Sequence, residues 1–372
     1  MLSLTFTHMS KAYGGVPALK DVSLSLMGGR VHALMGENGA GKSTLIKLIA
    51  GVVPADSMTV EKDGKAISLA NAQDAQAANF RFIHQELNIV PQISVAENIL
   101  LGRRFPRRFG LAVDWPSVRE RARAALRFLG ADHIDVRQLA GDFTAGDQML
   151  IKIAAALVND PDTDARADLY VLDEPTAALT AQESEMLFDV IKRLTSTGAA
   201  VLYVSHRMDE VLRICDDITV LRDGKHVSSG PVSETTKDQI IRAMTGRDVK
   251  DAYPPRADHQ RSDVIVNCRD VTTAHLSNLN FTLRAGEVLG VAGLAEAGQS
   301  EFLELLMGLE KLQSGQAQFI NGPLPTSPAQ AWARGVAYLP KERRTQGLML
   351  DMSIRANILA PHLRAYGLRA DK

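Results

Sequence analysis

The sequence has very little cysteine and no long apolar run. Cys215 and Cys268 are its only cysteines, far apart and without the paired spacing that is typical of zinc sites. A disulfide framework or a cysteine-based metal site is therefore not expected, and a reducing compartment is favoured. No stretch of about 18 apolar residues occurs, and the N-terminus lacks the basic and apolar regions of a signal peptide. We expect the chain to reach a membrane only through a partner.

The sequence also lacks a strong charge of either sign. Its formal net charge is −1 and its isoelectric point is about 6.8, so no basic field covers the whole chain. A nucleic-acid partner is therefore not expected. Apolar residues make up 45% of the chain and charged residues 23%, which is typical of soluble globular proteins. The length of 372 residues suggests about two domains.

A glycine-rich segment follows a short apolar strand at residues 30–34 and precedes a helix with an apolar face. Its spacing, Gly-x-x-x-x-Gly-Lys-Ser, is that of a P-loop, in which backbone N–H groups converge on phosphate oxygens. Lys42 is expected to reach the β- and γ-phosphates of ATP, and Ser43 is expected to place its hydroxyl on Mg²⁺. The residues predicted to bind ATP here are Gly36, Glu37, Asn38, Gly39, Ala40, Gly41, Lys42, Ser43 and Thr44.

Two adjacent acidic residues follow another apolar strand. Downstream of a P-loop, such a pair is typical of a Walker B element. Asp173 would hold Mg²⁺ directly or through water, and Glu174 would polarise the attacking water. The predicted strands alternate with helices, which indicates an α/β fold with a largely parallel sheet covered on both faces. These strands are residues 30–34, 169–172, 199–204 and 218–221.

The second part of the chain repeats the first. Residues 36–43 align with residues 293–300, and the flanking LKDVSLSLMGGRVHALMG aligns with LSNLNFTLRAGEVLGVAG. The copy has no counterpart to anything after about Leu111. Gln299 stands in place of the P-loop lysine, so little or no hydrolysis is expected at the second loop. The predicted domains are a complete one at 1–245, a turn-rich linker at 246–262 and a partial, degenerate copy at 263–372.

These motifs together resemble the ABC ATPases, and most closely the ATP-binding subunits of bacterial monosaccharide importers of the ribose, galactose and xylose type. The resemblance implies a P-loop NTPase fold with a RecA-like parallel sheet, an antiparallel β subdomain and a helical subdomain. A helix predicted at residues 119–129, without strands nearby, fits that helical subdomain. The resemblance also implies a partial second ABC domain, and a degenerate second site is usual in this family.

The resemblance implies roles for residues outside the P-loop. Gln85 is similar to the Q-loop glutamine, which touches Mg²⁺ and senses the permease, and His206 is similar to the switch histidine, which contacts the γ-phosphate. Tyr13 is similar to the aromatic residue that stacks on adenine. A signature loop is implied just before an apolar helix, although Phe-Thr stands where the family usually has Leu-Ser. Its residues are Thr144, Ala145, Gly146, Asp147 and Gln148.

The function that the resemblance implies is ATP hydrolysis coupled to sugar uptake. The chain would lie at the cytoplasmic face of the bacterial inner membrane, bound to an integral membrane permease that receives sugar from a periplasmic binding protein. ABC sites are shared between two domains, and this chain has no second signature loop. Either the second domain is truncated or two chains pair through their first domains, and a second ATPase chain is the expected partner. Two alternatives remain: a soluble tandem ABC protein of the translation-factor type, and a remnant or regulator that does not hydrolyse ATP.

An arginine cluster follows the predicted Q-loop region. It comprises Arg103, Arg104, Arg107 and Arg108. The cluster is first interpreted as a solvated loop, and the alternative is a surface near lipid headgroups or the permease. The sequence does not decide between these interpretations, and it does not specify the sugar, because an ATP site contacts only the nucleotide.

Overall fold

The computed structural model describes residues 2–83, 89–109, 111–158, 167–177, 179–246, 263–293, 297–320, 322–341 and 346–362. It divides into two units, Met1–Pro254 and Pro255–Lys372, and each has an apolar core of its own. The domain boundary predicted between residues 245 and 263 falls largely on residues outside the described ranges, so its position stays a prediction. No helix in the described ranges is both long and apolar enough to cross a membrane.

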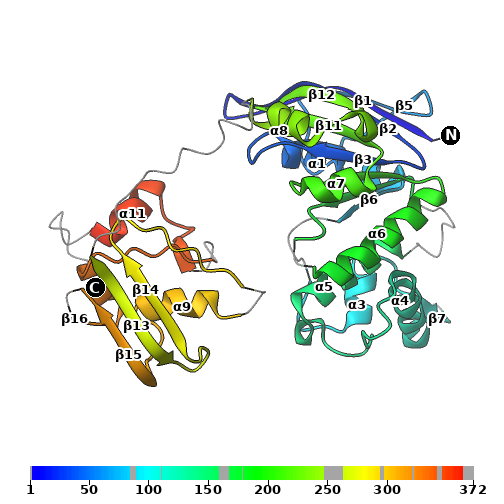
Figure 1. Ribbon diagram of the computed structural model, residues 1–372. Helices are drawn as coiled ribbons and strands as arrows, with labels where there is room; N and C mark the ends of the chain where they lie inside the picture. Colours follow the sequence, from blue (N-terminus) through cyan, green and yellow to red (C-terminus); the bar gives the residue numbers. More distant parts are fainter. Residues whose placement is uncertain are drawn as a thin grey trace. The chain divides into compact units, whose positions relative to one another are not determined.

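A mostly parallel sheet forms the centre of the first unit (Figure 1). Its strands are β3 (Val31–Met35), β6 (Phe80–Ile83), β9 (Leu169–Asp173), β10 (Ala200–Val204), β11 (Asp217–Arg222) and β12 (Lys225–Pro231). Their order is β12-β11-β3-β10-β9-β6, and only β12, at one edge, runs antiparallel to its neighbour. Every residue of β3 and β10 is buried, as expected for central parallel strands that read as continuous apolar runs.

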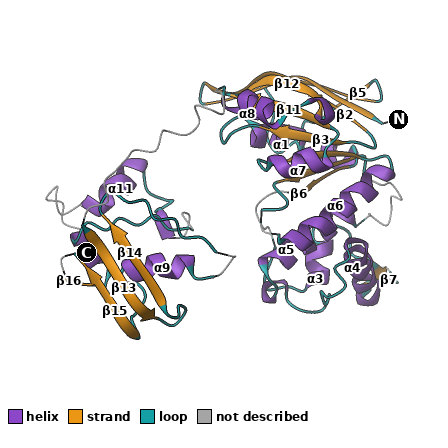
Figure 2. Ribbon diagram, viewed as in Figure 1, coloured by secondary structure: helices purple, strands orange, loops and turns teal. Residues whose placement is uncertain are grey.

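Helices cover both faces of this sheet (Figure 2). They are α1 (Lys42–Ile49), α2 (Ala72–Ala77), α6 (Ala181–Ser196), α7 (Met208–Ile214) and α8 (Lys237–Thr245). Successive side chains of a strand point to opposite faces of the sheet. On β10, Val201 and Tyr203 therefore pack in the core under α6, and Leu202 packs in the core under α1. The α/β fold predicted from alternating strands and helices is confirmed.

A second, antiparallel sheet packs on the α1 side of the first unit (Figure 1). Its strands are β1 (Ser3–Tyr13), β2 (Val16–Met27), β4 (Ser57–Lys62) and β5 (Lys65–Ile67), in the order β2-β1-β4-β5. Leu4 and Phe6 of β1 share a core with Leu45 and Leu48 of α1. Buried and exposed side chains alternate along β2, which is typical of an antiparallel sheet with one covered face.

A helical subdomain completes the first unit. Its helices are α3 (Val95–Leu100), α4 (Trp115–Leu129) and α5 (Ala145–Leu157), which pack on one another. The buried residues of α4, among them Val118, Ala122 and Leu126, recur at helical spacing along one face. Gly130 ends α4 in the left-handed conformation. A short hairpin of β7 (Arg107–Arg108) and β8 (Ala112–Val113) joins α3 to α4. The predicted helix at 119–129 is thus confirmed as part of a separate subdomain.

The second unit repeats the opening of the first. Its elements are β13 (Val264–Thr272), β14 (Leu279–Arg284), α9 (Gln299–Leu306), β15 (Ser314–Phe319), β16 (Gly322–Pro323), α10 (Pro328–Ala333) and α11 (Ile354–Leu359). The strands form one antiparallel sheet in the order β14-β13-β15-β16, which matches β2-β1-β4-β5. Phe281 of β14 packs edge-on against Phe302 of α9, with ring centroids 4.6 Å apart.

The second unit differs from the first at the segment that aligns with β3. Residues 287–293 form no strand, and Val288 is 98% exposed. β3 is hydrogen-bonded on both sides, to β10 and to β11, whereas no described strand of the second unit pairs with residues 287–293. A central strand needs hydrogen-bonding partners on both sides and packing against both faces of the sheet. An apolar sequence alone therefore does not make such a strand form.

Candidate nucleotide-binding site

The predicted P-loop spans the turn from β3 to α1. Gly36, Gly39 and Gly41 all have positive φ angles, of 155°, 85° and 101°. A Cβ on Gly36 would lie 2.4 Å from the carbonyl oxygen of Leu221, and one on Gly41 would lie 2.8 Å from that of Ala18. Gly36 and Gly41 are thus required by both conformation and space, whereas Gly39 is required by conformation alone. The result is a backbone loop that closes tightly at the N-terminus of α1, where a phosphate group is favoured.

Lys42 lies inside this loop. Its side chain is buried, and its Nζ donates hydrogen bonds to the carbonyl oxygens of Gly36 at 2.6 Å and Glu37 at 3.0 Å. Burial lowers the pKa of Lys42, whereas the carboxylates of Glu174 and Asp173 act to raise it. The ammonium group is therefore held between the P-loop and the acidic pair, where the phosphates of a nucleotide would lie.

The other predicted P-loop residues surround this ammonium group. Ala40 is buried, and its N–H donates to the carbonyl oxygen of Glu37 at 3.1 Å, which tightens the turn. Ser43 is exposed in the first turn of α1, so its hydroxyl is accessible to a ligand. Thr44, next in α1, is partly buried. The remaining residues of the loop are exposed: Glu37, Asn38 and Gly39.

The predicted acidic pair lies at the carboxyl end of β9, beside the end of β10. Burial and the neighbouring Glu174 carboxylate together raise the pKa of Asp173 to about 6, and the Lys42 ammonium group opposes this rise. Glu174 has a left-handed backbone with φ of 48°, and its N–H donates to the carbonyl oxygen of Val204 at 2.8 Å. A glutamate pays a conformational cost to adopt this geometry, and such strained residues cluster at functional sites.

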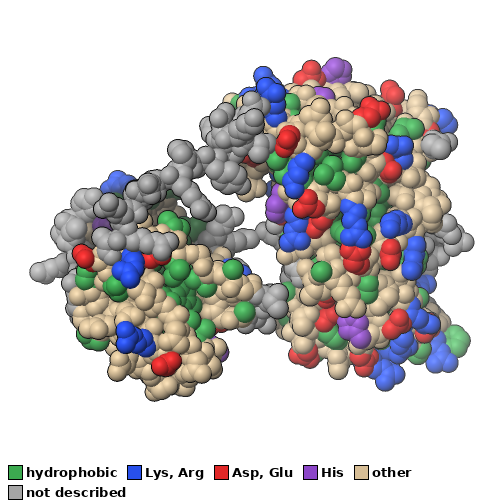
Figure 3. Space-filling model, viewed as in Figure 1, with side chains coloured by type: hydrophobic (Ala, Val, Ile, Leu, Met, Phe, Trp, Pro, Cys, Tyr) green, Lys and Arg blue, Asp and Glu red, His purple; other side chains and the backbone are tan. Residues whose placement is uncertain are grey.

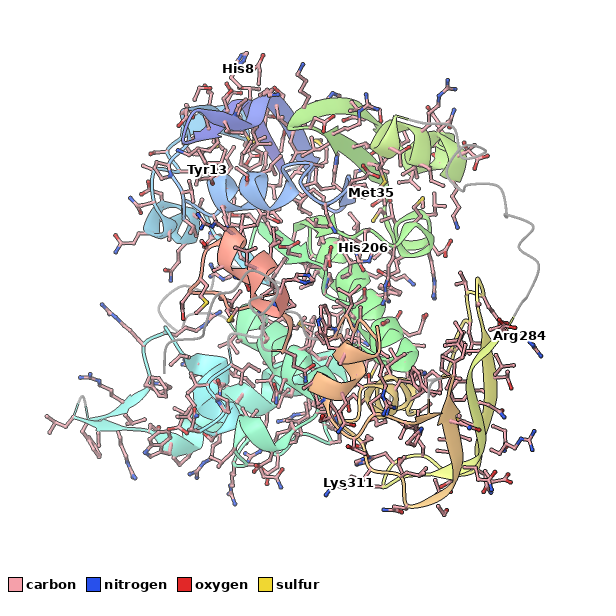
Figure 4. The ribbon with its side chains drawn as sticks, turned by 90° about the vertical axis from the view of Figure 1, so that its left-hand side faces the viewer. His8, Tyr13, Met35, His206, Arg284 and Lys311 are labelled. Atoms are coloured by element: carbon pink, nitrogen blue, oxygen red, sulfur yellow. The ribbon has the colours of Figure 1, made fainter. Side chains whose placement is uncertain are left out.

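His206 pairs directly with Glu174. The His206 Nδ1 and Glu174 Oε1 atoms are 3.0 Å apart, and the histidine side chain is 59% exposed while that of Glu174 is only 15% exposed. Figure 4 labels His206 and Met35, which ends β3, and the two lie where β3 and β10 both finish. The structure therefore brings Lys42, Asp173, Glu174 and His206 to one edge of the central sheet, as the strand order requires.

Glu210, in the first turn of α7, organises the surroundings of this edge and was not singled out from the sequence. Its Oε2 accepts hydrogen bonds from the hydroxyls of Tyr203 at 2.7 Å, Thr176 at 2.9 Å and Ser205 at 3.3 Å. Its Oε1 accepts one from Arg207 at 3.1 Å. One carboxylate thus fixes the segments that follow both β9 and β10. The sequence offered only a weak signal, an acidic residue four positions after the switch histidine.

The predicted signature loop lies at the start of α5. Thr144 caps this helix, because its Oγ1 accepts from the N–H of Asp147 at 3.2 Å. A Cβ on Gly146 would lie 2.6 Å from a carboxylate oxygen of Glu183, so no larger residue fits without movement. Gln148 donates to the carbonyl oxygen of Phe143 at 2.9 Å, and Ala145 is exposed. The signature loop is thus part of the helical subdomain, whereas the P-loop packs in the layer around α1.

Two further residues, Tyr13 and Gln85, were predicted to take part in the site. Tyr13, the last residue of β1, is 46% exposed, and the Nζ of Lys11 lies 5.8 Å from the centre of its ring. Figure 4 places it on the antiparallel sheet, where a flat ligand can reach the ring. Gln85 lies outside the described residues, so its predicted contact with Mg²⁺ stays a prediction.

A family model described as ABC transporter matches residues 19–177 and 276–371. The chain belongs to the ABC transporter family. Over 367 residues it is 41% identical to the ribose import ATP-binding protein RbsA of Chromobacterium violaceum, which covers 98% of this chain and 71% of that protein. It has the same identity, over the same length, to the RbsA of Bacillus cereus, which covers 98% of this chain and 72% of that protein.

A solved structure confirms the cassette fold of the first unit. A nucleotide-free ATP-binding cassette from an ABC transporter is 27% identical and superposes with a TM-score of 0.56, covering 66% of this chain and all of that one. An ATP-binding cassette of an ABC transporter in its ADP conformation is 25% identical, with the same TM-score and coverage. The P-loop NTPase fold predicted from the family resemblance is thus confirmed.

The residues of this ABC cassette fit ATP with Mg²⁺. The loop offers its backbone and a buried ammonium group to phosphates. Its close packing on β11 and β2 requires glycine, because a Cβ at Gly36 or Gly41 would clash with the carbonyl oxygen of Leu221 or Ala18. Within the described residues no group of three or more His, Cys, Asp or Glu side chains gathers to hold a metal alone. Mg²⁺ does not require such a cage, because it is commonly held by one or two protein oxygens together with phosphates. Ser43 and Asp173 offer those oxygens.

The second ABC match contains a loop with related geometry and different chemistry. Gly298 precedes α9 with a φ of 101°, the same value as Gly41 before α1. A Cβ on Gly293 would lie 2.5 Å from the Nε2 of Gln299, so the Gln299 side chain packs against Gly293 much as Lys42 packs against Gly36. A neutral amide therefore occupies the place of the ammonium group, and the second loop cannot supply a positive charge to phosphates.

Proposed function

We propose that this chain is the ATP-hydrolysing subunit of a bacterial monosaccharide importer, bound peripherally at the cytoplasmic face of the inner membrane. The single observation that carries the catalytic part is the arrangement of Glu174, paired with His206 at 3.0 Å, beside the buried Lys42 of the P-loop. The transport part is supported by relatives at 41% identity that are named ribose import ATP-binding proteins. ATP bound with Mg²⁺ would supply the phosphoryl group and an electrophilic phosphorus.

Each residue of the site has a distinct task in this proposal. The backbone of residues 36–44 and the Lys42 ammonium group hold the phosphates, and Ser43 and Asp173 provide oxygens for the metal. Glu174 accepts the proton of the attacking water, which a carboxylate in a partly buried pocket does effectively. His206 orients Glu174 and donates toward the γ-phosphate. The pairing of Glu174 with His206, beside the buried Lys42, favours an active ATPase over a remnant that does not hydrolyse ATP.

We further propose that a complete site forms between two chains. The signature loop lies in the helical subdomain and contacts Glu183 of α6, whereas the P-loop closes against β2 and β11. A second copy of the chain, facing the first in a symmetric dimer, supplies the signature loop that completes each P-loop.

Pairing of chains predicts that ATP hydrolysis depends on protein concentration. Well below the dissociation constant of the dimer, the rate per chain should fall about in proportion to concentration, because only dimers carry complete sites. Initial rates of phosphate release measured over a wide dilution series test this. A rate per chain that stays constant throughout the series contradicts the proposal, provided that the dilution reaches monomers by light scattering or sedimentation.

Mixing two inactive variants sharpens this test. Lys42→Ala removes the P-loop charge, and Ala145→Asp places a negative charge on the exposed signature surface at a helix N-terminus, where it should not disturb folding. A mixed dimer then contains one intact site, made from the P-loop of one chain and the signature loop of the other. An equal mixture should recover about a quarter of the wild-type rate, because half of a symmetric population is mixed dimer with one working site. No recovery would indicate that each chain uses its own signature loop.

We also propose where the permease binds this chain. A groove of about 390 Å³ lies between α2, β6 and α5, with apolar walls that include Val52 and Phe80 and with Arg81 and Lys152 among its lining residues. Phe82 of β6 also lines the groove, three positions before Gln85 in the sequence. A groove of this size suits a short helix from a membrane protein, since an amphipathic helix buries one apolar face in such a site.

Co-purification with the permease tests the transport function. The chain should be recovered with a polytopic membrane protein encoded beside it, and addition of a periplasmic sugar-binding protein with its sugar should raise ATP hydrolysis. Ala72→Trp, which fills the groove at an exposed position of α2, should lower recovery of the complex about tenfold or more and leave ATP binding unchanged. Recovery of the chain free of any membrane protein, with full ATPase activity, would refute the importer assignment.

A further inference from the structure

The β7–β8 hairpin carries two large apolar side chains that nothing in its own unit covers. Phe109 is 89% exposed and Leu111 is 91% exposed. They flank the turn of the hairpin, in which Arg107 pairs with Val113 and Arg108 pairs with Ala112. In Figure 3 a hydrophobic protrusion and neighbouring Lys or Arg side chains lie at the edge of the molecule where Figure 1 labels β7. Single exposed apolar residues are common, but a projecting pair at a hairpin tip indicates a contact surface.

The backbone at this tip is also unfavourable for the residue it carries. Phe109 has a left-handed φ of 52°, and the N–H of Leu111 donates to the carbonyl oxygen of Arg108 at 3.3 Å to close the turn. Glycine or asparagine is usual at a position with positive φ, because a bulky side chain is strained there. Phe109 thus combines a strained backbone with an exposed aromatic ring, and neither feature stabilises the folded hairpin.

Two arginines, Arg107 and Arg108, form the strand that leads into the tip. Arg103 lies elsewhere, because its guanidinium donates to the carbonyl oxygens of Ala155 and Val158 at the end of α5. The Arg108 guanidinium lies 5.7 Å from the centre of the Phe109 ring. The carboxylate of Asp114, at the base of the hairpin, accepts from the N–H and the hydroxyl of Ser117 and so caps α4. The tip therefore presents apolar side chains within a cationic surface.

The base of the hairpin is fixed to the helical subdomain. Phe105 packs edge-on against Trp115, with ring centroids 6.2 Å apart, and the N–H of Asp114 donates to the carbonyl oxygen of Pro106 at 2.8 Å. Phe105 also packs against the main core of the first unit. A rigid base lets the hairpin hold its tip outward without a large loss of conformational entropy on binding.

We propose that the tip of this hairpin inserts into the headgroup region of an anionic membrane. Phe109 and Leu111 would enter the boundary between headgroups and acyl chains, and Arg107 and Arg108 would contact lipid phosphates. The observations favour lipid over a protein partner because the tip projects from the surface and carries two exposed apolar side chains next to two arginines. The inference rests on the proposed function for the presence of a membrane, and vesicle binding tests it without the permease.

Trp115 provides a reporter next to the hairpin. The chain contains two tryptophans, so Trp332→Phe leaves Trp115 alone, 40% exposed and in contact with Phe105. We expect vesicles that contain phosphatidylglycerol with brominated acyl chains to quench this fluorescence, and vesicles of phosphatidylcholine alone to quench it much less. The full-length chain is used throughout, and ATP hydrolysis is measured in the same samples.

Paired variants separate the apolar and electrostatic contributions. Phe109→Ser with Leu111→Ser should weaken binding to anionic vesicles at least about tenfold, because the inserted apolar surface is lost. Arg107→Gln with Arg108→Gln should weaken it about 25-fold at low salt, since each basic residue near an anionic surface contributes about fivefold. Lys20→Gln with Lys65→Gln, and Leu309→Ser with Leu312→Ser, remove matched exposed groups elsewhere and should change binding by less than about twofold.

Vesicle affinity that is the same for the wild type and both hairpin variants would overturn the proposal, as would equal quenching by neutral and anionic vesicles. Hairpin variants that lose only permease binding, with unchanged vesicle binding, would show that the tip contacts protein instead. Loss of vesicle binding with full ATP hydrolysis supports the proposal. Absence of ATP hydrolysis in the wild type would instead count against the proposed function. The vesicle measurement would still test the membrane proposal, because it does not depend on ATP hydrolysis.

Discussion

Replacing Lys42 with alanine will weaken ATP binding by on the order of a thousandfold, because the one buried ammonium group of the P-loop is lost. Its two hydrogen bonds to loop carbonyls, at 2.6 and 3.0 Å, show that the loop is already folded around this charge. A phosphate that enters the loop without it meets a backbone cradle and the carboxylates of Asp173 and Glu174, which repel it. Titration calorimetry with Mg-ATP, or with a slowly hydrolysed analogue, measures the change.

Lys47→Ala is the matched control for this experiment. Lys47 lies one helical turn or more further along α1, is exposed, and carries the same charge on the same helix. Its removal should alter ATP affinity by less than about threefold, since exposed charges contribute little at this range. The unfolding temperature of each variant, measured without nucleotide, distinguishes a lost contact from a lost fold. Unchanged affinity in the folded Lys42→Ala variant would mean that the nucleotide binds elsewhere in the chain.

The sequence predicted the parts of the site that depend on a short stretch of chain. Glycine spacing located the turn at residues 36–41, and the structure gives its three glycines the positive φ angles that such a turn needs. The continuous apolar runs that became β3, β9 and β10 indicated central parallel strands, and these bring Asp173 beside the end of β10. The roles of the individual site residues stay proposals until the variants are measured.

Interactions between distant segments could not be predicted in the same way. The carboxylate of Glu210 accepts hydrogen bonds from Thr176, Tyr203 and Ser205, which lie at the ends of two strands. No spacing within a short stretch of sequence predicts such a network. Residues 287–293 show that a similar local sequence can also fail to form the same element. They align with β3 in sequence, yet they form no strand in the second unit, because pairing partners on both sides decide whether an apolar run becomes a central strand.

Glu174→Gln should separate binding from turnover. The amide keeps the size of the side chain and retains a partner for His206, so we expect ATP affinity to change by less than about threefold. It cannot accept a proton, and loss of a general base typically lowers turnover about 10²- to 10⁴-fold. Single-turnover phosphate release, measured beside equilibrium ATP binding, gives both quantities on one sample. Glu185→Gln, at an exposed carboxylate of α6 that pairs with Arg213, is the matched control and should hydrolyse ATP normally.

Asp173→Asn distinguishes the two members of the acidic pair. Burial and the Glu174 carboxylate raise the pKa of Asp173 to about 6, and the Lys42 ammonium group acts to lower it. In our assignment it supplies an oxygen to the metal, so its loss should weaken Mg²⁺-dependent ATP binding, whereas Glu174→Gln should leave that binding intact. If Glu174→Gln instead turned over at the wild-type rate while Asp173→Asn lost turnover without losing binding, the proton acceptor would be Asp173. The contact between Glu174 and His206 would then serve only to hold the ends of β9 and β10 in register.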